Sequence, residues 1–131
     1  MLTEEMQAGL QGALPSALGT VDEDEIPNIS YISQVFYVDD DHVALSNQFF
    51  NKSMRNIKSN GVATVNIVRP DNFKSWYLEL KYIESKTDGE LFEKMKMQLE
   101  AIASMTGMED VFKLHASEVF EVVKVHEVIM S

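Results

Sequence analysis

The sequence has no cysteine, only three prolines and six glycines, and no apolar run near the roughly 18 residues of a membrane-spanning helix. Without cysteine, disulfides, thiolate metal sites and thiol catalysis are excluded. Basic residues are also few, because 11 Lys and Arg stand against 21 Asp and Glu, for a formal net charge of -10. A surface of that sign repels phosphate backbones, so nucleic-acid binding is not expected.

The chain also lacks any segment that would divide it or direct it to a membrane. Its 131 residues are 45% hydrophobic and 24% charged, an ordinary globular mixture, and we expect a single domain over residues 1–131. We find no Gly/Ser linker and no internal repeat. The first ten residues are acidic and lack the basic and apolar regions of a signal peptide. These features predict a soluble, cytoplasmic protein that does not bind membranes.

The pattern of apolar and polar residues predicts six strands, several of them joined by short acidic turns. They are expected at residues 14–21, 26–38, 42–46, 62–68, 76–83 and 119–129. Helices are expected at residues 3–12, 51–59 and 88–105. Because the strands follow one another so closely, a doubly wound parallel sheet is excluded. The sequence therefore predicts a mainly β fold, a small antiparallel β-barrel with peripheral helices.

The acidic residues are unevenly distributed along the chain. Residues 42–70 contain no Asp or Glu, whereas an even distribution would place four or five there. The same 29 residues contain Lys52, Arg55, Lys58 and Arg69, so they carry about +4. The other 102 residues carry about -14. This contrast indicates that part of the acid-free segment needs a positive potential.

The predicted helix at 51–59 begins inside the acid-free segment and suits an anionic ligand. Asn51 is a plausible N-cap, followed by the Lys52 charge and the Ser53 hydroxyl. The N–H groups of a helix start lack intrahelical partners and favour anions. Asn56 is expected one turn further on the side of Lys52. No Gly-rich phosphate loop precedes this helix, and a helix start that binds only water remains an alternative.

Five short motifs at these positions resemble the pyridoxamine 5'-phosphate oxidase-like FMN-binding split-barrel family. They are LGTVD at 18–22, PNISYIS at 27–33, LSN at 45–47, NKS followed by NI at 51–57, and NGVA at 60–63. The resemblance covers about residues 5–83, and the late helix and last strand agree in order and length.

The resemblance implies a six-stranded antiparallel split barrel that forms a homodimer, with FMN as cofactor near the subunit interface. By position, Lys52 and Ser53, with Asn51 beside them, become ligands of the FMN phosphate. Ser46 and Asn47 are placed close to the phosphate or the ribityl chain. The expected wall beside the isoalloxazine ring, whose backbone groups bond the ring edge, consists of Ser30, Tyr31, Ile32 and Ser33.

The sequence departs from the pattern of true pyridoxamine phosphate oxidases. Those enzymes have an Arg and a Lys where Asn28 and Ser33 stand here, and basic residues in a C-terminal segment where only Lys124 is basic. Oxidation of a pyridoxal vitamer is therefore not expected. The resemblance instead implies an FMN-dependent oxidoreductase that passes hydride or electrons between a small-molecule donor and acceptor. No catalytic side chain is assigned, because the flavin carries the chemistry.

Two alternatives to an enzyme remain open at this point. The first is a non-catalytic flavin-binding sensor, carrier or electron-transfer module that uses the same site. The second is a barrel that has lost flavin and binds another ligand, such as haem.

No resident metal site is expected, because His42, His115 and His126 are too scattered for a metal motif. We expect His126 to pair with a neighbouring carboxylate, and one of Trp76 and Tyr77 to lie in the core.

Overall fold

The computed structural model describes residues 1–10, 15–32, 34–47, 51–107 and 113–128. Within these ranges the chain forms seven strands and four helical segments. The strands are β1 (Ser16–Val21), β2 (Pro27–Ile32), β3 (Val35–Asp39), β4 (His42–Asn47), β5 (Val62–Val68), β6 (Ser75–Lys86) and β7 (Ala116–Val128). The helices are α1 (Glu4–Gln7), α2 (Asn51–Asn60) and α3 (Gly89–Thr106), and a 3₁₀ turn, η1 (Ala8–Leu10), follows α1.

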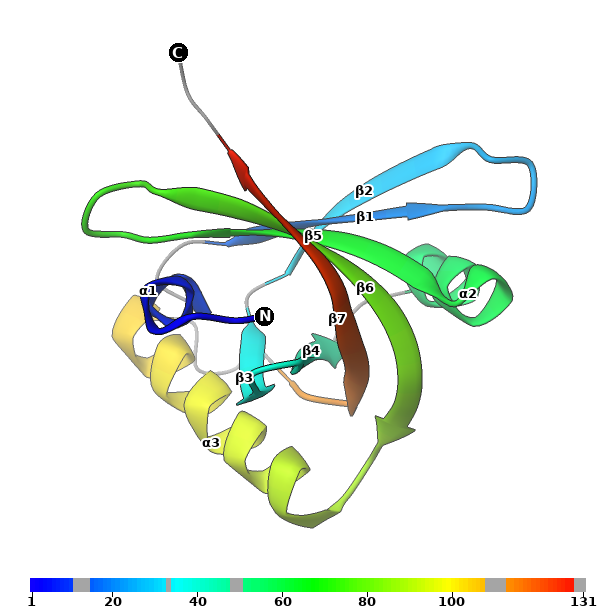
Figure 1. Ribbon diagram of the computed structural model, residues 1–131. Coiled ribbons are helices and arrows are strands. Elements are labelled where there is room, and N and C mark those ends of the chain that lie inside the picture. Colours follow the sequence, from blue (N-terminus) through cyan, green and yellow to red (C-terminus); the bar gives the residue numbers. More distant parts are fainter. Residues whose placement is uncertain (11–14, 33, 48–50, 108–112, 129–131) are drawn as a thin grey trace.

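All seven strands belong to one antiparallel sheet in the order β2-β1-β5-β6-β7-β4-β3. The sheet is strongly twisted, with α2 beside the β1–β2 hairpin and α3 beside β3 and β4 (Figure 1). The prediction of a mainly β, antiparallel fold with peripheral helices is confirmed. The expected strand number was wrong, because there are seven strands instead of six. The sheet also does not close into a full barrel, so β2 and β3 are its two edges.

The extra strand arises because the segment predicted as one strand at 26–38 is divided. Its first half is β2 at one edge of the sheet, and its second half is β3 at the other edge. Gln34 lies between them and is only 1% exposed. Its amide Nε2 donates to Met95 O at 3.1 Å and to Gln98 Oε1 at 2.7 Å, both in α3. The buried amide therefore fixes the crossing point of the chain against α3.

The main core cluster lies on one face of the sheet, where alternate residues of β1, β5 and β6 are buried. In β6, Trp76, Leu78 and Leu80 are buried while Tyr77 is 48% exposed, so the prediction that one aromatic of this pair lies in the core is confirmed. Met95 and Leu99 of α3 pack in a second cluster with residues of β4 and β7. None of the helices within the described ranges is long and apolar enough to cross a membrane.

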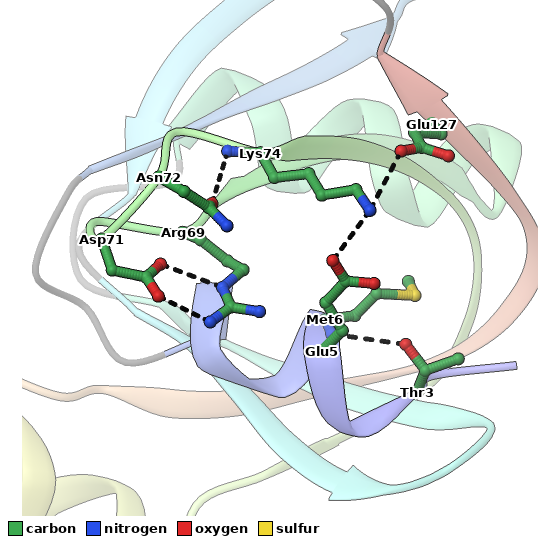
Figure 2. A network of polar contacts seen from close by, with 8 residues as sticks. All are labelled: Thr3, Glu5, Met6, Arg69, Asp71, Asn72, Lys74 and Glu127. Carbon is green, nitrogen blue, oxygen red and sulfur yellow. Dashed lines mark hydrogen bonds and ion pairs between the residues drawn. The ribbon is translucent and has the colours of Figure 1, made fainter.

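Polar contacts attach the N-terminal helix to the turn between β5 and β6 (Figure 2). Thr3 caps α1 as predicted, because its Oγ1 accepts a hydrogen bond from Met6 N at 3.3 Å. Lys74 Nζ lies 2.8 Å from Glu5 Oε1 and 3.4 Å from Glu127 Oε1. The helix expected at 3–12 continues as η1 to Leu10, and the last two positions of that prediction lie outside the described residues.

Candidate functional site

Helix α2 has one buried face and one exposed face, and the two differ in charge. The buried face, formed by Ser53, Met54, Asn56 and Ile57, lies beside β1 and β2. The exposed face carries Lys52, Arg55 and Lys58. The helix ends at Asn60, and Gly61 follows it with φ of 72°, a left-handed conformation that glycine adopts without steric cost. The fold therefore presents the basic side chains of α2 to solvent.

Polar side chains fix the first half of α2 to the β1–β2 hairpin. Ser53 is 3% exposed, and its hydroxyl accepts a hydrogen bond from Asn28 Nδ2 at 3.1 Å and shares one with Ser30 Oγ at 3.0 Å. One turn later, Asn56 Nδ2 donates to Thr20 Oγ1 at 3.1 Å. The structure thus brings Ser30 and Ser53 into contact. The Ser53 hydroxyl, however, contacts β2 and orients the helix start.

The expected position of Asn56 on the side of Lys52 was wrong. Asn56 is 6% exposed and contacts β1, whereas Lys52 is exposed. Four residues advance a helix by about 1.1 turns, and that small rotation is enough to carry Asn56 across the boundary between the two faces. The side chain of Asn51 is outside the described part of the structure, so its expected contact with phosphate stays a prediction.

The positive charge of the acid-free segment is concentrated on α2. Lys52, Arg55 and Lys58 form no ion pair with any described residue. Arg69, at the other end of the segment, donates to Asp71 Oδ1 at 3.0 Å and to Oδ2 at 2.6 Å. Its charge is therefore neutralised by a carboxylate just beyond the segment. The start of α2, where Lys52 and Arg55 have no ion-pair partner among the described residues, is the best candidate for an anion site.

Strand β2 is an edge strand, and half of its backbone groups are directed away from the sheet. Asp22 N donates to Ile26 O at 3.1 Å in the hairpin, and paired residues alternate along an antiparallel ladder. This alternation places Pro27, Ile29 and Tyr31 at positions whose backbone groups do not bond β1. Proline has no N–H, which fits that position. The backbone groups of Ile29 and Tyr31 are therefore available to a ligand at the edge.

The side chains of the expected ring-side wall point in two directions. Tyr31 is 76% exposed on the outer face of the sheet, whereas Ile32 is 4% exposed in the core. Ser30 faces Ser53, as described above, and Ser33 lies outside the described residues. A flat ligand along β2 would therefore meet the backbone of this strand and the exposed side chains of Ile29 and Tyr31.

Ser46 and Asn47 lie at the end of β4, which is far from β2 in the strand order. Ser46 is 1% exposed. Asn47 Nδ2 donates to Glu118 Oε2 at 2.8 Å, and Tyr82 Oη donates to Glu118 Oε1 at 3.1 Å. Burial, together with the Glu118 carboxylate, raises the pKa of Tyr82 to about 12, so the phenol remains a donor. The Asn47 amide is thus directed to Glu118, and its expected place beside the cofactor stays a prediction.

The sequence reasoning missed Asn28, Thr20 and Glu118 as members of buried polar contacts. Asn28 has the same strand parity as Ser30, so its inward direction was a detectable signal. Glu118 precedes an apolar alternation and looks like a surface acid, so no local pattern revealed its burial. The predicted partnership of His126 with a carboxylate is confirmed, because its Nε2 contacts Glu79 Oε2. No group of three or more metal-ligating side chains is found among the described residues.

Comparison with known proteins places this fold in a recognised class. The structure is similar to an FMN-binding protein from Syntrophomonas wolfei, with a TM-score of 0.78 and 23% identity over 97% of this chain and 86% of that one. HupZ of Group A Streptococcus gives a TM-score of 0.75 and 19% identity over 98% and 94%. HutZ, a heme storage protein from Vibrio cholerae, gives 0.59 and 16% over 96% and 94%. At these identities the likeness concerns the fold alone.

The family model for pyridoxamine 5'-phosphate oxidase matches residues 2–123. The chain therefore belongs to the pyridoxamine 5'-phosphate oxidase family. No curated protein matches it.

Proposed function

We propose that the protein binds FMN and acts as an oxidoreductase on a small substrate. The observation that carries the proposal is the start of α2. There Lys52 is exposed and has no acidic partner among the described residues, and Ser53 and Ser30 hold this end of the helix beside β2. A helix start with a lysine is an anion site whose N–H groups and charge act together. Family membership and the FMN-binding structural relative support the flavin as the ligand.

The residues present fit a flavin nucleotide. Lys52 and the first N–H groups of α2 would hold the phosphate, and the backbone groups of Ile29 and Tyr31 would bond the edge of the ring. The bound flavin would supply hydride or electron transfer. The side chains of Asn28, Ser30 and Ser53 keep the helix start and the edge strand in fixed relation, so that phosphate and ring are oriented together.

A second copy of the chain is part of the proposal. Ile29 and Tyr31 are 71% and 76% exposed on the outer side of β2, which is a large apolar exposure for adjacent positions of one strand face. A partner subunit placed there would cover both side chains and exclude water from the ring. Sedimentation of the FMN-saturated protein should therefore give a dimer. A monomer that still binds FMN fully would remove the partner from the proposal.

The test of the flavin site compares FMN with riboflavin, which lacks the phosphate. Binding is followed by the quenching of flavin fluorescence. We expect wild-type protein to bind FMN more tightly than riboflavin, and Lys52→Ala to lose most of that preference. Lys96→Ala is the matched control, because it removes an exposed lysine from α3 without touching α2. Equal binding of the two flavins by wild-type protein would contradict a phosphate site at α2.

A separate measurement distinguishes an enzyme from a flavin-binding module. Steady oxidation of a nicotinamide donor by the FMN-loaded protein, with a small acceptor such as a quinone, is expected for an oxidoreductase. Binding of FMN without turnover of donors and acceptors would instead favour a carrier, sensor or electron-transfer role for the same site.

A further inference from the structure

The exposed face of α2 carries a basic strip formed by Lys52, Arg55 and Lys58, and the proposed flavin site uses only the first of them. The three residues occupy every third position. Each therefore lies about 4.5 Å further along the helix axis than the one before it, and about 60° around the helix. The proposed phosphate of FMN needs the helix start and Lys52. Arg55 and Lys58 are left without a role in holding the flavin.

The basic strip is fixed in direction, because the opposite face of α2 is anchored to the sheet. Ile57 is fully buried, and Asn56 Nδ2 donates to Thr20 Oγ1 at 3.1 Å. These contacts keep the strip turned to solvent. A charge held in this way is available to a ligand without a large loss of side-chain and backbone freedom.

The charge of the basic strip is not neutralised by the fold. None of its three cations has an ion-pair partner among the residues that the structure describes. Most other basic residues in those ranges are in an ion pair or lie opposite an acid in a neighbouring strand. The ion-paired ones are Arg69, Lys74, Lys86 and Lys94, and those opposite Glu121 and Glu79 are Lys81 and Lys124.

The positive potential of the strip is strongest over the first two turns of α2. Near the last turn, Ser59 Oγ donates to Glu23 Oε1 at 3.2 Å, and Glu23 belongs to the acidic turn at residues 22–25. The carboxylates of that turn lower the potential around Lys58. A second anionic group would therefore bind near Arg55, whose planar guanidinium can bond a phosphate through two parallel hydrogen bonds.

We infer that the basic strip binds the phosphates of an electron donor, a reduced nicotinamide dinucleotide, and that Arg55 holds its pyrophosphate. This placement rests on the proposed function, because the donor lies on the flavin held at Lys52. In FMN and in the dinucleotide alike, one sugar-derived chain separates the redox ring from the phosphate. When the rings stack at about 3–3.5 Å with both chains on the same side, the pyrophosphate falls beside the flavin phosphate, at the next turn of α2.

Arg55 has a defined part in the reaction that follows. The dihydronicotinamide ring gives up a hydride, which is two electrons and one proton, to the bound flavin. The donor leaves as the nicotinamidium form, and the flavin is reduced by two electrons. Arg55 takes no part in this transfer, and it determines which donor is accepted. The rest of the surface, at a net charge of -10 for the chain, repels an anionic donor and so leaves the strip as its place of contact.

ADP-ribose measures the phosphate contacts without electron transfer, because it keeps the pyrophosphate and lacks the nicotinamide. Isothermal titration calorimetry of the FMN-saturated protein should show ADP-ribose binding, and Arg55→Ala should weaken it about tenfold. Lys96→Ala is the matched control, since it removes an exposed lysine of α3 and should leave the affinity unchanged. Equal losses in the two variants, or no binding of ADP-ribose by the wild-type protein, would overturn the inference.

Stopped-flow reduction of the bound FMN measures the choice of donor. NADH and dihydronicotinamide riboside transfer the same hydride from the same ring, but only NADH has phosphates. We expect NADH to half-saturate the wild-type protein at a concentration at least about tenfold lower. Arg55→Ala should lose most of this advantage, Lys96→Ala should keep it, and added salt should reduce it because salt screens exposed charges. Equal half-saturation of the wild-type protein by the two donors would contradict a phosphate contact.

FMN affinity separates this inference from the proposed function. Arg55→Ala should bind FMN as tightly as the wild-type protein, whereas Lys52→Ala should not. If the two variants lose FMN to the same degree, Arg55 belongs to the flavin phosphate site, and the inference falls while the flavin function stands. If the wild-type protein does not bind FMN, the proposed function falls, and the placement of the donor falls with it.

Discussion

Two groups of basic residues lie close together in the sequence and end up in opposite electrostatic states. Lys52, Arg55 and Lys58 project from α2 with no ion-pair partner among the described residues. Arg69 and Lys74, around the β5–β6 turn, are both paired with carboxylates, and Lys74 also lies 5.8 Å from the ring centre of Trp76. A basic residue creates positive potential only where the fold places no acid beside it.

The comparison explains why the two groups serve different purposes. The paired group connects α1, the β5–β6 turn and the end of β7, where exposed ion pairs add little stability individually. The unpaired group lies on a helix whose buried face is firmly attached to the β1–β2 hairpin, so its charges are held in place without being neutralised. That combination suits binding of an anion.

The largest effect is expected from detaching α2. Ile57 is fully buried on the inner face of the helix. Ile57→Ala should lower the free energy of unfolding by about 2–5 kcal/mol, because the cost of the cavity adds to the loss of buried apolar surface. Urea unfolding measures this change. Lys58→Ala, on the exposed face of the same helix, should change stability by less than about 0.5 kcal/mol. Similar effects of both substitutions would mean that α2 is not anchored by its buried face.

The next largest effect is expected on FMN affinity, which should depend on the unpaired basic group and not on the paired one. Lys52→Ala should weaken FMN binding by about 1.5–3 kcal/mol, the value of a hydrogen bond to a charged group. Arg69→Ala removes the same charge from the paired group and should leave FMN affinity unchanged. Fluorescence titration of FMN measures both. Equal losses in the two variants would show that overall charge, and not the position of Lys52, governs binding.

A smaller effect is expected for the hydroxyl that orients α2. Ser53→Ala removes the partner of Asn28 and Ser30 and should cost about 1–3 kcal/mol of stability, because buried polar groups are left unsatisfied. Thermal unfolding measures it. Ser59→Ala, whose hydroxyl contacts exposed Glu23, is the control and should be nearly neutral. A neutral Ser53→Ala would show that the buried contact does not hold the helix start.

The smallest effect concerns the pH dependence of the paired group. Hydrogen bonds from Arg69 hold the pKa of Asp71 below the usual 3.8. The stability that this ion pair contributes is therefore complete above that value, and it is lost as the pH falls through the lower pKa of the folded state. Asp71→Asn should therefore slightly reduce the decrease in melting temperature between pH ~5 and ~3. Lys52→Ala should leave that decrease unchanged. A steeper decrease in Asp71→Asn would contradict the assignment.

Much of the fold could be predicted because it depends on local periodicity. The strand at 62–68 and the apolar stripe of α3 were predicted closely, since alternation and helical spacing are properties of neighbouring residues. The division of 26–38 was not, because Gln34 breaks the strand through contacts with α3, about 60 residues away in the sequence. No proline or glycine marks that break.

The candidate site was predictable to the same degree. The helix start at Lys52 follows from sequence, as does the presence of unbalanced positive charge nearby. Other features depend on which elements meet in the fold. They are the inward direction of Ser53, the ion pair of Arg69 with Asp71 and the hydrogen bond from Asn47 to Glu118.

The position of β7 has a consequence for how the chain is made. It is the last of the seven strands along the polypeptide, yet it lies between β6 and β4 and alone connects the β3–β4 hairpin to the rest of the sheet among the described pairings. The contact between Asn47 and Glu118 spans 71 positions. During translation the hairpin can therefore join the sheet only after β7 has been synthesised. Such long-range closure is intrinsically slow. Until then, the nascent protein exposes unpaired strand edges, and this is the stage at which chaperones have the most to protect.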